Sequence, residues 1–283
     1  MADGGIVVSG GTTGHGTLLA CNLLYSPLLL DSSRKPLARP SFTLGGTAGE
    51  TGYEAAFAAD RDMATLYKTA ASGDNLQITI DMGAGNTNIV YGVALLGHNL
   101  TESNIDDAGD SVAGAWFEGG PTTGYAGVSA ALTLNEDTMT PAYHLLETPA
   151  AYRYWRVRVN FNASTALQIG ELFLIGATPL AFTDNYNKNF IKNLEIGKVE
   201  NDGISGVPHF HARWERVRLD IVFDMIPTTQ LAAMQVAARN GHVIFSPEGV
   251  SSFAYFGVLS LEQPKYIGNG LWNVTAHFTE SAV

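Results

Sequence analysis

Residues that could bind a sugar gather in and around one glycine-rich loop. Three aromatic residues lie within residues 99–127, a long segment rich in Gly, Asp and Pro, and three polar residues flank it or follow it along the chain. A flat aromatic ring can pack against the apolar face of a sugar, and nearby polar side chains can bond to its hydroxyl groups. The candidate ligand-binding residues are His98, Asn99, Trp116, Phe117, Tyr125 and Arg153.

The same residues have a second interpretation. Aromatic side chains dominate protein interfaces as well, so these rings could pack on their own domain or against a neighbouring subunit. We favour this packing interpretation, and sugar binding stays open as the alternative.

No set of residues with the spacing of a known catalytic site is present. The segment GGTTGHGT at residues 10–17 lacks the Lys-Ser/Thr of a phosphate-binding loop. The sequence has neither a G-x-S-x-G nucleophile motif nor an H-E-x-x-H metal motif, and nothing singles out a pair of catalytic carboxylates. We therefore expect a protein that is not an enzyme.

Composition and charge exclude several partners. Hydrophobic residues make up 46% of the 283 residues and charged residues 15%, which is enough apolar material for a folded core. The net charge is −11, and residues 1–180 hold 17 acidic against 8 basic side chains. Such a surface repels phosphate backbones, so we expect no nucleic acid as a partner. No apolar run reaches the ~18 residues of a membrane span, so we expect no membrane insertion.

Alternating apolar and polar residues predict β-strands in the first half of the chain. Residues 76–81 place Leu76, Ile78 and Ile80 on one face, and residues 153–161 alternate in the same way around Trp155. Residues 89–97 are apolar on both faces, as in a central strand. We predict a flexible arm over residues 1–20 and an all-β sandwich or jelly roll over residues 21–178.

The second half predicts a different β-rich domain over residues 184–283. Alternating strands recur there, and one helix is predicted over residues 228–240, where Pro227 precedes the segment and Gly241 follows it. The predicted fold class is therefore mainly β: a sandwich followed by a β-rich assembly domain that carries one α-helix.

Five short motifs in the first half of the chain occur in the same order as in a known protein family. They are Ala-Asp-Arg-Asp-Met-Ala-Thr at residues 59–65, Ile-Asp-Met-Gly at 80–83, a strand ending in Gly-His-Asn-Leu at 97–100, Tyr-Trp-Arg-Val at 154–157 and Ile-Gly-Glu-Leu-Phe at 169–173. Together they resemble the discoidin, or coagulation factor type C, branch of galactose-binding-like domains. The resemblance implies a jelly-roll β-sandwich. The chain departs from the family in having Tyr67 near the position of a frequent Trp, and in lacking the paired cysteines of the animal members.

The resemblance also implies a structural cation, because the family often uses the first motif as a Ca²⁺ loop. Carried over, Asp60, Asp62, Thr65 and Glu171 would supply the oxygen ligands that a hard cation prefers. The alternative is that the two aspartates only bond turn amides and that Glu171 pairs with a nearby basic residue. Structural Ca²⁺ is the only cofactor we predict.

A second resemblance concerns the whole chain. The segment NLLYSPLLLDSS at residues 22–33, followed by the predicted sandwich, resembles virion proteins of tailed bacteriophages, and residues 184–283 are similar in layout to phage tail and baseplate proteins. The predicted function is therefore a structural virion protein of the tail, baseplate or capsid decoration. It would assemble with copies of itself and with other virion proteins, and its location would be the virion. The alternative is a carbohydrate-binding module or adhesin that recognises host surface glycans.

Overall fold

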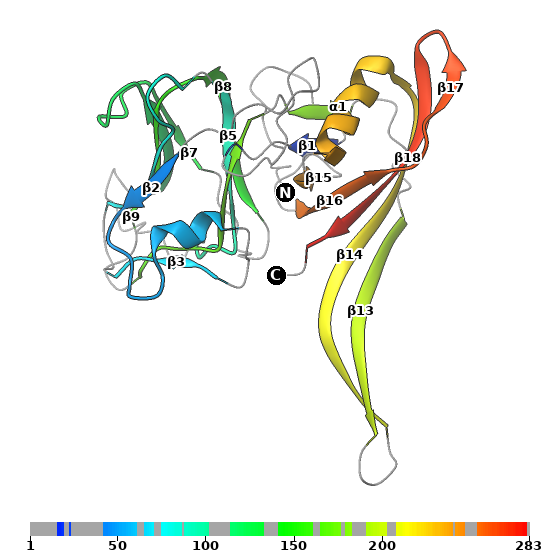
Figure 1. Ribbon diagram of the computed structural model, residues 1–283, viewed down its shortest axis with the longest axis horizontal. Coiled ribbons are helices and arrows are strands. Elements are labelled where there is room, and N and C mark those ends of the chain that lie inside the picture. The colour runs from blue at the N-terminus through cyan, green and yellow to red at the C-terminus, as the bar shows by residue number, and fades with distance from the viewer. Residues whose placement is uncertain are drawn as a thin grey trace, which may run out of the picture.

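The computed structural model is mainly β, with one α-helix and several antiparallel sheets (Figure 1). Among the residues described, no helix has the length and apolar character needed to cross a bilayer. The structure describes residues 16–19, 23, 42–60, 65–70, 75–86, 88–101, 114–132, 141–160, 165–176, 179–182, 191–202, 208–239, 241–246 and 254–281.

The first domain is a β-sandwich of two antiparallel sheets, as predicted. A short 3-10 helix, η1 (Ala55–Ala59), and a two-stranded pair, β3 (Tyr67–Lys68) with β10 (Gln168–Ile169), close one end. The three-stranded sheet has the order β11 (Glu171–Ile175), β5 (Val90–Leu96), β8 (Ala142–Ala150). The five-stranded sheet has the order β2 (Thr43–Gly46), β4 (Leu76–Asp81), β9 (Tyr154–Asn160), β6 (Gly114–Gly120), β7 (Val128–Ala131).

Side-chain alternation fills the space between the two sheets. Trp155 from β9 is fully buried there and stacks on Phe117 from β6, with the ring centroids 5.0 Å apart. Gly119 leaves the room for this stack, because a Cβ at that position would lie 2.5 Å from the Trp155 ring. The core therefore depends on one glycine beneath its largest side chain.

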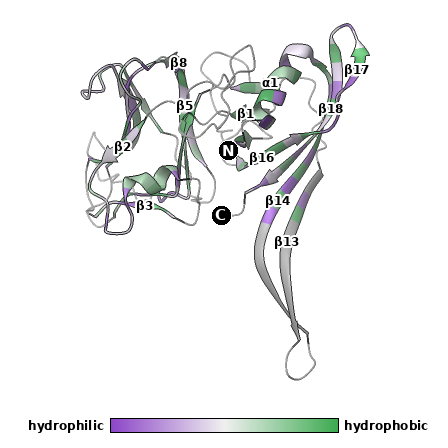
Figure 2. Cartoon of the chain, in the orientation of Figure 1, coloured by the Kyte–Doolittle hydropathy of each residue, from purple (hydrophilic) through white to green (hydrophobic). Residues whose placement is uncertain are grey.

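Strand β5 contributes to two cores, which confirms its prediction as a strand that is apolar on both faces. Val93 and Leu95 point into the sandwich, whereas Ala94 and Leu96 join a separate buried cluster with residues of the second domain. Figure 2 colours much of β5 as hydrophobic. The cluster between the domains consists of Leu19, Ala94, Leu96, Tyr143, Phe173, Ile175, Ile244 and Ala254. The three-stranded sheet is thus covered on both faces, while the described residues cover only one face of the five-stranded sheet.

The second domain is built on one large antiparallel sheet. A single helix, α1 (Thr228–Arg239), packs on it through Leu231, Met234 and Ala237, close to the predicted range of 228–240. The sheet order is β12 (Leu180–Phe182), β1 (Gly16–Leu19), β15 (His242–Ser246), β16 (Tyr255–Leu261), β18 (Leu271–Glu280), β14 (Pro208–Pro227), β13 (Ile191–Asp202), with β17 (Lys265–Gly268) also on β18.

Strand β1 differs from the sequence prediction for the chain's start. The flexible arm was predicted over residues 1–20, yet residues 16–19 pair with β12 on one side and β15 on the other, and Leu18 and Leu19 are buried. These partners lie more than 150 residues further along the chain, so short-range patterns cannot reveal them. Residues 1–15 lie outside the described residues.

A long two-stranded ribbon projects from the second domain (Figure 1). Strand β14 pairs with β18 only from Arg218 to Pro227, and its earlier part pairs with β13 alone. The strand pairing runs from Glu195 opposite Arg216 to Asp202 opposite Pro208. Within the part of the chain that the structure describes, this ribbon has no third strand.

Candidate functional site

The face of the five-stranded sheet that points away from the core carries a concentrated set of charged and aromatic residues. We call it the outward face; its members treated below are Gln77, Asp81, Trp116, Glu118, Ser129, Tyr154, Arg156 and Arg158, with Tyr125 and Arg153 from adjoining loops. Strand alternation creates it, because Trp155 and Val157 are fully buried and their neighbours Arg156 and Arg158 must point the other way.

Glu118 lies at the centre of the outward face and binds two arginines. Its Oε2 accepts hydrogen bonds from Nε of Arg156 at 2.5 Å and from Nε of Arg158 at 3.3 Å. Its Oε1 accepts one from the Ser129 hydroxyl at 3.3 Å. Nη1 of Arg156 also donates to Oε1 of Gln77 at 3.1 Å. These contacts join β4, β9, β6 and β7 into one polar network across the sheet.

The charge state of Glu118 follows from these contacts. Its residue is 8% exposed, and burial alone favours the neutral acid. The hydrogen bonds and positive charges of Arg156 and Arg158 outweigh burial and hold the pKa of the Glu118 carboxyl below its usual range. Glu118 is therefore a carboxylate at neutral pH, and the two guanidinium groups share one negative charge.

Each arginine of the network also covers an aromatic ring. The guanidinium carbon of Arg156 lies 4.3 Å from the ring centroid of Tyr125, and that of Arg158 lies 4.1 Å from the ring centroid of Trp116. A cation over an aromatic face is attracted by the ring's electron density. Both arginines are consequently held from two directions, by a carboxylate and by a ring.

A third arginine repeats this arrangement at the edge of the face. Nε and Nη2 of Arg153 donate to the two carboxylate oxygens of Asp81, each at 2.7 Å, and its guanidinium lies 4.6 Å from the Tyr154 ring centroid. The Arg153 hydrogen bond is the main reason that the pKa of Asp81 lies below its usual range. This pair is more exposed than the Glu118 network.

The structure brings three of the predicted ligand-binding residues to the outward face. Trp116, Tyr125 and Arg153 come from a strand and two loops, and all three are partly exposed there. Arg156, Arg158 and Glu118 were not among the predicted site residues, although they form the centre of the outward face. The signal that could have found the arginines is the alternation in residues 154–160, which already separates them from the buried set.

Phe117 follows the favoured packing interpretation and not the sugar-binding alternative. Its side chain is fully buried and stacks on Trp155 inside the sandwich, so its ring does not face a ligand at the surface. The segment was expected to be a loop, in which adjacent rings can point together. It is strand β6, in which Phe117 must point opposite to Trp116.

His98 and Asn99 also serve the interior. His98 is buried, and its Nδ1 accepts a hydrogen bond from the Leu100 amide at 3.1 Å. The Asn99 side chain accepts from the Gln168 amide at 2.9 Å and donates to the Ala166 carbonyl at 2.7 Å. These bonds hold the turn after β5 against the segment that leads into β10, which corrects the expectation that both side chains are available to a ligand.

The predicted cation loop is described only in part. The Thr65 hydroxyl donates to Oδ2 of Asp60 at 2.7 Å, and Glu171 is buried at the start of β11, which contacts η1 next to Asp60. Asp62 lies outside the described residues. Within those that are described, no group of three or more His, Cys, Asp or Glu side chains comes together. The oxygen donors fit the chemistry of a hard cation, and Ca²⁺ stays a prediction.

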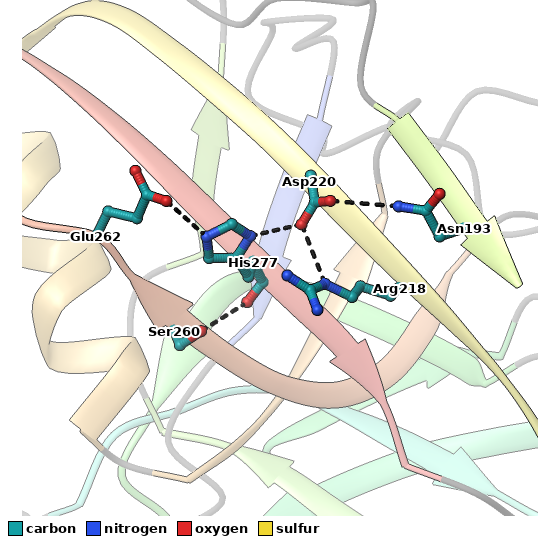
Figure 3. A network of polar contacts seen from close by, with 6 residues as sticks. All are labelled: Asn193, Arg218, Asp220, Ser260, Glu262 and His277. Carbon is teal, nitrogen blue, oxygen red and sulfur yellow. Dashed lines mark hydrogen bonds and ion pairs between the residues drawn. The ribbon is translucent and has the colours of Figure 1, made fainter. Parts of the chain in front are cut away.

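The large sheet of the second domain carries another polar network (Figure 3). Asp220 on β14 accepts from Nε of Arg218 at 3.2 Å and lies 2.5 Å from Nδ1 of His277 on β18. Nε2 of His277 lies 3.1 Å from a carboxylate oxygen of Glu262. The Asp220 hydrogen bond, assisted by Glu262, raises the pKa of His277 above its usual value.

This second network contains Ser260, His277 and Asp220, yet it is not arranged as a catalytic triad. The Ser260 hydroxyl donates to the backbone carbonyl of His277 at 3.4 Å and does not contact the imidazole. The ring nitrogen that a nucleophile would need is instead bound to Glu262 (Figure 3).

Comparisons with known proteins find structural similarity alone. No protein-family model and no curated protein matches the chain. Among solved structures, it is similar to the family 32 carbohydrate-binding module of C. perfringens NanJ in complex with galactose, at 14% identity and a TM-score of 0.35, over 47% of this chain and 92% of that one.

Two further solved structures are of the same kind. The family 32 module of AlyQ in complex with 4,5-unsaturated mannuronic acid has 19% identity and a TM-score of 0.35, over 48% of this chain and 95% of that one. Chitosan-binding module 1 of the chitosanase/glucanase from Paenibacillus sp. IK-5 has 16% identity and a TM-score of 0.36, over 55% of this chain and 99% of that one.

Proposed function

We propose that this chain is a carbohydrate-binding protein and that the outward face of its five-stranded sheet is the binding surface. One observation carries the proposal: Trp116 and Tyr125 lie on one partly exposed face, each held against an arginine, with the Glu118 carboxylate between the two arginines. This function corresponds to the alternative that the sequence analysis left open.

The chemistry of the outward face suits a sugar. A sugar ring presents apolar C–H surfaces beside hydroxyl groups that both donate and accept hydrogen bonds, so its site needs rings, donors and acceptors close together. Tyr125 and Trp116 supply the rings, Arg156 and Arg158 the donors, and Gln77 an acceptor. Because ion pairs and ring contacts already fix these side chains, little conformational entropy remains to be lost on binding.

A glycan array followed by calorimetric titration of the best ligand tests the proposal. Trp116→Ala is expected to weaken binding at least about tenfold, or about 1.4 kcal/mol. Tyr266→Ala is the matched control, because Tyr266 is an aromatic residue on β17 in the second domain and is 55% exposed. Equal binding by wild type and Trp116→Ala would contradict the proposed surface.

The projecting ribbon favours a second candidate function, assembly with other protein subunits. A two-stranded ribbon is only marginally stable in water, and its open edges invite pairing with another chain. Residues 195–202 and 208–216 form such a ribbon in this protein. This feature supports the predicted assembly role, whereas the virion as the place of assembly and the phage proteins as partners stay predictions.

Light scattering tests the assembly role. In a shortened variant, an Asn-Gly turn replaces residues 197–214, so that the pair Ile196–Glu215 closes a tight hairpin. We expect the full chain to form a multimer, and the shortened variant to be a monomer that still binds the same glycan. A full chain that stays monomeric at high concentration would contradict self-assembly.

A further inference from the structure

Among the residues that the structure describes, Arg158 uses only a small part of its hydrogen-bonding capacity. A guanidinium group has five N–H donors, and the Arg158 contact with Glu118 uses only the one on Nε. Within the described residues, neither Nη1 nor Nη2 of Arg158 donates to an acceptor. The side chain is 18% exposed, so it is partly accessible.

The contacts of Arg158 also fix the orientation of the free donors. Glu118 holds Nε, and the guanidinium carbon lies over the Trp116 ring, 4.1 Å from its centroid. Two parallel N–H groups on Nη1 and Nη2 form the fork that matches both oxygens of a carboxylate. Within the same face, Arg153 makes a related bidentate contact, in which Nε and Nη2 donate to the two oxygens of Asp81.

The balance of charge on the outward face favours one added negative charge. Among the described residues, Arg153, Arg156 and Arg158 pair with the two carboxylates of Glu118 and Asp81, so this set has one positive charge in excess. The surrounding chain is acidic, with a net charge of −11. The net negative charge repels densely charged anionic polymers at long range. A single carboxylate is still attracted at short range by the excess positive charge of the outward face.

We infer that the outward face recognises an acidic sugar, whose carboxylate is bound by Nη1 and Nη2 of Arg158 and whose ring lies beside Trp116. The inference rests on the proposed function and narrows its ligand to saccharides with a carboxylate group. Uronic acids and sialic acids share that chemistry, and densely sulfated polymers and nucleic acids do not fit it.

Calorimetric titration of the full chain with three methyl glycosides tests this inference. Methyl glucoside and methyl glucuronide differ only by the carboxylate at C6, and methyl sialoside carries its carboxylate at the anomeric carbon. At least one acidic glycoside is expected to bind about tenfold or more tightly than methyl glucoside. Whichever acidic glycoside binds better identifies the source of the carboxylate.

Conservative variants locate the contact. Arg158→Lys keeps the charge but removes the fork, so the preference for the acidic glycoside is expected to fall about tenfold. Arg218→Lys changes an arginine that is likewise bound to a carboxylate, in the second domain, and is expected to keep the preference. If Arg158→Lys does not fold, ¹⁵N spectra of the wild type serve instead, with the Arg158 side-chain signal expected to shift on adding the acidic glycoside.

The outcomes separate the two proposals. Equal affinity for neutral and acidic glycosides, both lost in Trp116→Ala, would overturn the acidic ligand and leave the carbohydrate-binding function standing. A preference that survives in Arg158→Lys, or an Arg158 signal that does not shift, would overturn the role of Arg158. No binding of any glycan on the array or of any of the three glycosides would overturn both proposals.

Discussion

The outward face of the sandwich and the polar network of the second domain both place arginines and carboxylates on an open sheet surface, but they differ in what the charges contact. In the second domain, Asp220 binds Arg218 and His277, and Glu262 takes the other imidazole nitrogen. On the outward face, a single carboxylate, Glu118, serves two arginines.

The partner of an arginine decides which of its N–H groups remain available for further hydrogen bonds. An arginine over an aromatic ring is held in place without using its N–H groups, because the ring attracts the charge through its face. A carboxylate partner consumes donors as it fixes the side chain. On the outward face, rings help to hold Arg156 and Arg158, and within the described residues Arg158 donates only through Nε. The hydrogen bonds of the second network join β13, β14, β16 and β18.

The largest expected effect is the difference in stability lost by substitutions on the two faces of β6. Phe117→Ala removes a buried ring from its stack on Trp155 and is expected to lower the free energy of unfolding by about 3–5 kcal/mol. Trp116→Ala, one residue away on the outward face, is expected to lower the free energy of unfolding by about 1 kcal/mol or less while it weakens glycan binding about tenfold or more. Urea denaturation measures both. Similar losses of stability in the two variants would show that the outward face is part of the core.

The carboxylate of the outward face comes next. Glu118→Gln leaves Arg156 and Arg158 side by side without their shared negative charge, and the Glu118 side chain is only 10% exposed. Breaking such a pair is expected to cost about 3 kcal/mol by urea denaturation. The matched change Glu262→Gln in the second network, at a side chain that is 56% exposed, is expected to cost about 0.5 kcal/mol or less. A larger loss of stability in Glu262→Gln than in Glu118→Gln would contradict this prediction.

A smaller effect depends on pH and concerns the second network. The raised pKa of His277 means that the folded state binds the proton more tightly than the unfolded state. This stabilisation is fully present below the usual histidine pKa of about 6.5 and is lost as the pH rises through the folded-state pKa. In the wild type, the free energy of unfolding is expected to decrease by about 1 kcal/mol or less as the pH rises through this range. We expect His277→Gln to abolish this decrease. Unfolding curves of wild type and variant at several pH values measure it, and parallel pH profiles would contradict it.

The smallest effect is expected at the edge of the outward face. Asp81→Asn weakens the bond to Arg153, but both side chains are about one third exposed, so water replaces much of the interaction. The expected loss is about 0.5 kcal/mol by thermal or urea denaturation. Because the variant raises the positive charge of the face, affinity for an acidic glycoside is expected to stay the same or rise slightly. A clear fall in that affinity would show that Asp81 itself contacts the ligand.

Strand alternation made much of the sandwich predictable. The burial of Leu76, Ile78 and Ile80, the two-faced character of β5 and the helix after Pro227 all follow from local patterns, because backbone geometry forces side chains to alternate or to recur each turn. The candidate site was only half predictable. Trp116 and Tyr125 were selected as aromatic residues in a glycine-rich segment. The same rule also selected Phe117, because it did not consider that adjacent residues of a strand point to opposite faces of the sheet.

The class of the fold and the composition of each strand face therefore follow from local patterns in the chain. Tertiary structure alone decided which strands became neighbours. It placed Glu118 of β6 between Arg156 and Arg158 of β9, and it inserted residues 16–19 into a sheet formed mostly by the last hundred residues. Side-chain direction depends on the local backbone, so short patterns reveal it. Strand pairing depends on contacts between segments far apart along the chain. The entropy lost in closing the loops between such segments is offset only by the contacts of the whole fold.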